Sequence, residues 1–118
     1  MQDSVLLVFA DPTLLKRLSV FLARRGYVCR AAPALGEAVA MLRRAACTWV
    51  VVDIDLLGTR IVEATDELRA ASPGTQLVGL DTLAGQEGTD RAAAPFDAVL
   101  PKPFFLDSLL ATLPPQRQ

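Results

Sequence analysis

Four charged residues stand directly after short apolar runs, where strands of a sheet are expected to end. Asp11, Asp53 and Asp81 follow the first, third and fourth of these runs, and Lys102 follows the fifth. Because the carboxyl ends of parallel strands meet at one edge of a sheet, three carboxylates and one ammonium are expected to converge there. Such a set could bind a small cation or take part in phosphoryl transfer. The plainer alternative is that these residues cap helices and lie in solvated loops.

The composition removes several other classes of chemistry. The chain contains no histidine, which excludes Ser-His-Asp and Cys-His hydrolases, the usual zinc proteases and His-ligated zinc fingers. Its formal net charge is −1 and its basic residues are scattered, so we expect this domain to bind no nucleic acid. Cys29 and Cys47 are too few for a disulfide framework or a four-cysteine metal site. They are interpreted as small buried residues in a reducing compartment.

The 118 residues are 52% apolar and 21% charged, which predicts one packed domain. We place that domain over residues 1–113 and interpret 114–118 as the start of a linker or a disordered tail. The N-terminal residues lack the basic region of a signal peptide, and no uncharged run is long enough to span a membrane. A cytoplasmic location without membrane contact is therefore expected.

The elements that must position the charged residues alternate along the chain. Short apolar runs typical of buried strands are Val5–Ala10, Tyr27–Ala31, Thr48–Asp53, Gln76–Leu80 and Ala98–Leu100. Segments with apolar residues at helical spacing follow four of them, at 12–25, 33–44, 60–71 and 104–113. A fifth helix is expected at 83–94 from its place in the alternation, although Gly85 and Gly88 weaken it by roughly 1 kcal/mol each. The pair Asp11-Pro12 predicts an N-cap followed by proline at the first helical position.

This strict alternation predicts an α/β fold with a parallel sheet. For five strands in a chain of this length, the flavodoxin-like arrangement is favoured: a three-layer sandwich around a five-stranded parallel sheet in the order 2-1-3-4-5. Pro101 fits this order only if the fifth strand lies at an edge, because proline cannot donate to a central ladder.

Three short motifs carry a resemblance to a known family. They are Asp-Ile-Asp-Leu at 53–56 after the hydrophobic strand, Gly26-Tyr27 after the first helix, and Lys-Pro-Phe at 102–104 before the last helix. In their order and separation they resemble the receiver domains of bacterial two-component response regulators. The resemblance runs from Val5 to Leu113 and implies the receiver version of the flavodoxin-like fold, which serves signal transduction in phosphorelays.

The resemblance also implies roles for individual residues. Asp53 matches the position that accepts the phosphoryl group, and Lys102 matches the residue that contacts this group. The Lys102–Pro103 peptide bond matches one that is commonly cis in the family, which makes it a cis-peptide candidate.

The departures from the family pattern concern the same site. Phosphorylated receivers usually carry an acidic pair at the end of the first strand, which helps to hold Mg²⁺; here Phe9 and Ala10 take these positions, and Asp11 falls one place later as a helix cap. Asp81 replaces the hydroxyl residue that ends the fourth strand, and Val99 replaces the aromatic switch residue. These replacements remove metal ligands and add a repelling charge, so the resemblance implies a degenerate pocket.

The predicted function is therefore that of an atypical receiver, which is not an enzyme, needs no cofactor or metal, and acts by binding a protein partner or a second copy. The alternative is a working receiver that is phosphorylated on Asp53, with Asp11 and Asp55 recruiting Mg²⁺. A small flavodoxin-like enzyme is a third possibility, but no glycine-rich phosphate loop follows the first strand. Phe105 is an interface candidate, because helical geometry cannot turn both it and Phe104 toward the core; an ordinary exposed side chain is the alternative.

Overall fold

The computed structural model describes residues 4–81, 95–101, 109 and 111. The strands are β1 (Ser4–Val8), β2 (Val28–Ala32), β3 (Trp49–Asp53), β4 (Gln76–Asp81) and β5 (Ala98–Pro101). The α-helices are α1 (Pro12–Ala23), α2 (Leu35–Arg44) and α3 (Ile61–Ala71), and a short 3₁₀ helix, η1 (Ile54–Leu57), follows β3.

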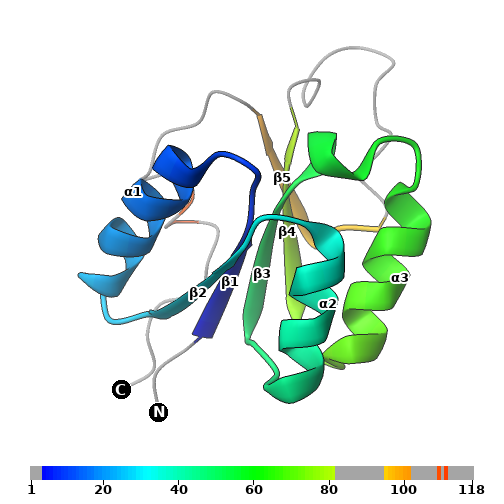
Figure 1. Cartoon of the computed structure of the whole chain (residues 1–118), viewed down its shortest axis with the longest axis horizontal. Helices are drawn as coiled ribbons and strands as arrows, with labels where there is room; N and C mark the ends of the chain where they lie inside the picture. The colour runs from blue at the N-terminus through cyan, green and yellow to red at the C-terminus, as the bar shows by residue number, and fades with distance from the viewer. Residues whose placement is uncertain (1–3, 82–94, 102–108, 110, 112–118) are drawn as a thin grey trace.

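The strands form one parallel sheet in the order β2-β1-β3-β4-β5, as predicted. β5 lies at an edge and ends at Pro101, which satisfies the restriction that proline imposes. Figure 1 shows α1 on one face of the sheet and α2 and α3 on the other. The predicted arrangement of helices on both faces of a parallel sheet is thereby confirmed.

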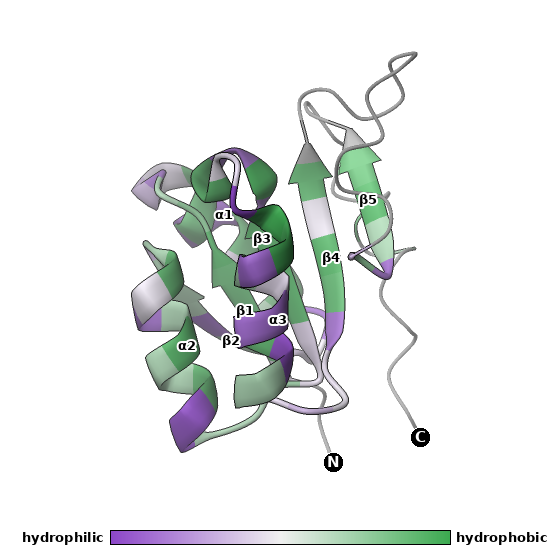
Figure 2. Ribbon diagram, turned by 90° about the vertical axis from the view of Figure 1, so that its right-hand side faces the viewer, coloured by the Kyte–Doolittle hydropathy of each residue, from purple (hydrophilic) through white to green (hydrophobic). Residues whose placement is uncertain are grey.

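Two apolar cores fill the space between the layers, and the alternation of side chains along each strand divides residues between them. Leu6 and Val8 of β1 belong to the core under α2 and α3, whereas Val5 and Leu7 belong to the core under α1. Figure 2 shows the apolar strands behind α2 and α3, whose outer sides carry hydrophilic bands. Because its central strands are buried on both faces, the sheet is a rigid base for the loops at its edges.

α1 begins and ends as its sequence predicts. The Asp11 side chain caps the helix by accepting hydrogen bonds from the backbone N–H groups of Thr13 and Leu14, and Pro12 occupies the first helical position. Gly26 follows the helix with a φ of 94°, a conformation that glycine adopts without strain. Within the described residues, no helix has the length and apolar character needed to cross a membrane.

The element boundaries differ from the predicted ones at several points. β1 ends at Val8 rather than Ala10, because the next residues lead into the cap of α1, and β2 is displaced by one residue toward the C-terminus. η1 was not predicted, since four residues give no periodic pattern. The predicted helix at 83–94 and most of the one at 104–113 lie outside the described residues; Leu109, which is helical, is buried in the core under α1.

Candidate functional site

The carboxyl ends of the strands lie together at the upper edge of the sheet in Figure 1, beside η1. In the strand register, Val8 is opposite Val52, so Phe9 and Asp53 leave their strands at the same level. Asp53 is itself opposite Leu80, and Asp81 follows one residue later, opposite Pro101. Of the four strand ends at which charged residues were expected, the backbone therefore brings three to one edge of the sheet: those of β1, β3 and β4.

Asp53 lies half-buried at the end of β3 and starts η1. Its side chain caps this short helix, because its Oδ1 atom accepts a hydrogen bond of 3.1 Å from the backbone N–H of Asp55. The Asp55 side chain is exposed. A carboxylate used in this way has a structural task that does not depend on any phosphoryl group.

Ile54 fixes the direction in which the chain leaves β3. Its side chain is fully buried and lies where a side chain of Gly79, on the neighbouring strand β4, would stand. A Cβ atom added to Gly79 would come within 2.9 Å of Ile54 Cγ1 and 3.2 Å of Phe96 Cδ1. Gly79 therefore makes room for Ile54 and thereby sets the position of Asp53. A single glycine inside an apolar strand is the sequence signal that could have indicated this close approach.

Phe9 is fully buried in the core under α1, with Leu18, Leu22 and Trp49 among the residues of that core. Its backbone N–H donates to the carbonyl of Ala32, which extends the contact between β1 and β2 beyond the last paired residues. Ala10, the next residue, is exposed. Neither side chain carries an oxygen, so the positions that match the acidic pair of receivers provide no metal ligand.

Asp11 is exposed and turned toward the backbone of its own helix. Its Oδ1 atom accepts from the Thr13 N–H at 2.9 Å and from the Leu14 N–H at 3.3 Å. Both hydrogen bonds of the cap use the same oxygen of the carboxylate. Asp11 is thus engaged at the start of α1, while the side chains at positions 9 and 10 carry no oxygen. No group of three or more potential metal ligands occurs among the residues described.

Val99 lies on β5 opposite Gly79, and its half-buried side chain packs against the core under α2 and α3. The other predicted site residues fall beyond what the structure describes. They are the side chain of Asp81 and the residues Lys102, Pro103 and Phe105. The role of Lys102, the cis peptide bond before Pro103 and the exposure of Phe105 therefore stay predictions.

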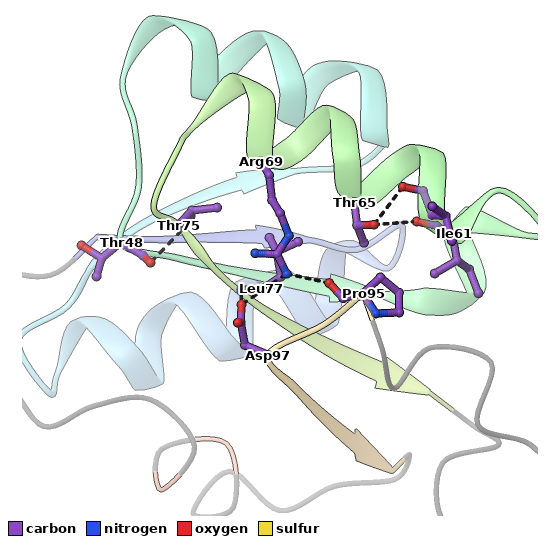
Figure 3. Close-up of polar contacts among 9 residues, drawn as sticks. Thr48, Ile61, Thr65, Arg69, Thr75, Leu77, Pro95 and Asp97 are labelled. Atoms are coloured by element: carbon purple, nitrogen blue, oxygen red, sulfur yellow. Dashed lines mark hydrogen bonds and ion pairs between the residues drawn. The ribbon is translucent and has the colours of Figure 1, made fainter.

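A polar network connects the turn before β5 to α3 (Figure 3). The sequence did not predict this network. The carboxylate of Asp97 accepts a hydrogen bond of 2.7 Å from the Leu77 N–H, and the Asp97 N–H donates to the Leu77 carbonyl at 2.8 Å. Arg69 of α3 lies across this turn, with its Nη2 atom 2.6 Å from the Pro95 carbonyl oxygen and 3.5 Å from Asp97 Oδ2. The only sequence signal is an aspartate just ahead of a short strand, which is common in loops.

The two cysteines are free thiols, as predicted. Cys47 is buried, and its Sγ atom lies 2.6 Å from the Arg30 guanidinium, which also donates to the Ala45 carbonyl. Cys29 is half-buried, and this burial, together with the nearby Cys47, raises the pKa of its thiol.

The sequence matches no protein-family model and no curated protein. The structure, in contrast, is similar to a response regulator from Burkholderia pseudomallei with a phosphorylated aspartic acid and a calcium ion. The TM-score is 0.82 at 24% identity, over 96% of this chain and 67% of that one. A response regulator from Thermotoga maritima gives 0.82 at 22% identity, over 95% and 94%. The receiver domain of a sensor histidine kinase from Pseudomonas aeruginosa, with a magnesium ion in its active-site cleft, gives 0.79 at 23%, over 95% and 94%. The chain therefore has the fold of response-regulator receiver domains.

Proposed function

We propose that this chain is a cytoplasmic signalling module that uses the receiver fold to bind proteins and is not switched by phosphorylation of Asp53. The observation that carries the proposal is the buried Phe9, which stands at the edge of the sheet where phosphorylated receivers have a metal-binding acid. An aromatic side chain in the core cannot ligate a cation. The module would then need no cofactor and would perform no catalysis of its own.

Electrostatics supports the same proposal. A phosphoryl donor is an anion, and without a bound cation it must approach the Asp53 carboxylate against like charge. The backbone of Asp81 lies one residue beyond the strand partner of Asp53, and we expect its charge to add to this repulsion. Phosphoryl transfer to Asp53 should therefore be slow, and its product should be weakly stabilised.

The alternative is a working Mg²⁺-dependent receiver that is phosphorylated on Asp53. The observation in its favour is that Asp53 stands at the end of β3 with its side chain only half-buried, next to the exposed Asp55. Asp11 caps α1 through Oδ1 alone, so in this alternative its other carboxylate oxygen would be the one to contribute a ligand. Positions 9 and 10 would still supply no side-chain oxygen.

The experiment that separates the two functions is a phosphorylation assay with a small donor. The protein is incubated with Mg²⁺ and acetyl phosphate, and its intact mass is measured beside an Asp53→Asn variant and a receiver that is known to be phosphorylated. We expect no mass gain in this chain while the positive control gains one phosphoryl group. A gain that disappears in Asp53→Asn would establish the working receiver and overturn the proposal.

A second measurement detects binding of Mg²⁺ or of a phosphoryl analogue that is not followed by phosphoryl transfer. Amide chemical shifts are followed while Mg²⁺, and then Mg²⁺ with beryllofluoride, is titrated into the protein. We expect no saturable shifts around Asp53, because positions 9 and 10 offer no ligand. Saturable shifts at Asp53 and Asp55 would show that the pocket retains a metal site and would count against the proposal.

A further inference from the structure

The outer side of α1 carries an unusual concentration of positive charge. Of the residues that the structure describes, six line a hollow of about 580 Å³ on this side: Lys16, Arg17, Val20, Phe21, Arg24 and Arg25. Four of them are cations, although the formal net charge of the whole chain is −1. We call these six residues the α1 basic face. The rest of the chain therefore carries an excess of negative charge.

These cations have no anionic partner within the described part of the chain. α1 contains no acidic residue, and the carboxylate at its start, Asp11, is occupied by backbone N–H groups. The ion pair found among the described residues joins Arg69 to Asp97, away from α1. The cations of the α1 basic face are therefore available to pair with a bound anionic group.

An apolar centre lies between the cations. The side chain of Val20 is 43% exposed, which makes it the exposed large apolar residue of α1. Phe21 beside it is half-buried, and the Arg25 guanidinium lies 4.2 Å from the centre of its ring. This stacking holds one cation in place and leaves its N–H groups available at the rim of the hollow. The surface thus combines an apolar floor with a charged rim.

We propose that the α1 basic face is a docking site for a partner protein, which inserts an apolar side chain beside Val20 and places carboxylates against the surrounding cations. This inference rests on the proposed function as an interaction module and adds the chemistry of the partner. A rim of cations around an apolar centre fits the charge-complementary protein interfaces in which electrostatics sets specificity. Nucleic-acid phosphates would leave Val20 without an apolar partner, and one exposed valine is too little apolar surface to enter a membrane.

The outer side of α3 gives a concrete picture of such a partner surface. Val62 is 59% exposed there, and Glu63, Asp66 and Glu67 are exposed around it. α3 and α1 lie on opposite faces of the sheet (Figure 1), so the two surfaces of one molecule cannot meet. A second copy could bring its α3 to the α1 basic face only through head-to-tail contacts, which form rings or open chains and not a two-fold dimer. We assign the site to a different protein, and self-association is tested separately.

The test uses a designed helical peptide with glutamates on both sides of a leucine stripe, and a counterpart in which glutamine replaces every glutamate. Fluorescence anisotropy measures their binding to the intact chain. We expect the glutamate peptide to bind and to weaken as salt rises from about 50 mM to about 500 mM, because salt screens exposed charges. The glutamine peptide should bind at least about tenfold more weakly, which corresponds to 1.4 kcal/mol.

Variants then locate the binding site. Lys16→Glu/Arg17→Glu should weaken the glutamate peptide by at least about tenfold, and Val20→Ser by a smaller factor, because it removes only the apolar centre. The matched control is Arg43→Glu/Arg44→Glu, which reverses two exposed cations at the end of α2 and should leave binding unchanged. Lys16→Gln/Arg17→Gln, which removes the charge without reversing it, should give an intermediate loss.

Four outcomes would overturn the proposal. They are equal binding of both peptides, equal losses in the α1 and α2 variants, and tighter binding of single-stranded DNA or of phosphatidylserine vesicles than of the peptide. The fourth is self-association in analytical ultracentrifugation that both Lys16→Glu/Arg17→Glu and Glu63→Lys/Glu67→Lys abolish, since the occupant would then be a second copy. The phosphorylation assay on Asp53 is independent of these measurements, so failure of the proposed function is distinguishable from failure of this site.

Discussion

Phe9 links the stability of the protein to the proposed function of its candidate site. The side chain is fully buried in the core under α1. Replacing it with alanine should lower the free energy of unfolding by about 3–5 kcal/mol, because a large apolar group is removed from a packed core. The matched control is Ala10→Asp, one residue away and exposed, which should change stability by less than about 0.5 kcal/mol. Urea denaturation followed by circular dichroism measures both, and a loss below about 1 kcal/mol in Phe9→Ala would contradict this account.

Residue identities predicted some local roles and not others. The Asp11-Pro12 pair indicated a helix cap because the acceptor and the fixed φ of proline are both local properties. The core in which Phe9 is buried depends on which face of the sheet each residue of β1 points to. The sequence leaves this open when several consecutive residues are apolar. The task of Gly79 depends on the Ile54 side chain, which comes from a different part of the chain and cannot be read from neighbouring residues.

At the scale of elements, Asp97 connects β4, the start of β5 and α3. Its carboxylate accepts from the N–H of Leu77, a fully buried residue. Asp97→Ala should destabilise the protein by about 1–3 kcal/mol, because a backbone donor loses its partner. Asp97→Asn should lose less, since its amide oxygen can accept the same hydrogen bond. Thermal denaturation compares the two variants.

The Arg69 contact provides the control for that measurement. The side chains of Arg69 and Asp97 are 40% and 36% exposed, and an ion pair in such a position is worth at most about 1 kcal/mol. Arg69→Met should therefore cost less than Asp97→Ala. If the two variants lose equal stability, the link between α3 and β5 depends on the ion pair and not on the hydrogen bond to Leu77.

At the scale of the whole molecule, the topology was the most predictable feature. Alternation of apolar strands with amphipathic helices leaves few ways to bury both, and Pro101 restricts its strand to an edge. The strand order was predicted from the flavodoxin-like arrangement that suits five strands in a chain of this length, and it is the order observed. The candidate site was less predictable, because its properties depend on where a strand stops: β1 ends at Val8, which leaves Phe9 in the core and Asp11 on its helix.

The same topology predicts how stability is distributed across the sheet. β1 and β3 lie in its interior, pair on both sides and are almost entirely buried, whereas β2 and β5 pair on one side only. β2 in addition has exposed or half-buried side chains at four of its five positions. Native-state hydrogen exchange should therefore show the slowest amides in β1 and β3, which open only when the whole domain unfolds, and faster exchange in β2 and β5. If the edge amides exchange as slowly as those of β3, the edge strands are covered. For β2 the cover would be a second copy of the chain, and dilution of the protein should then restore fast exchange. Exchange that stays slow in dilute protein would instead show that the edge strands unfold together with the centre of the sheet.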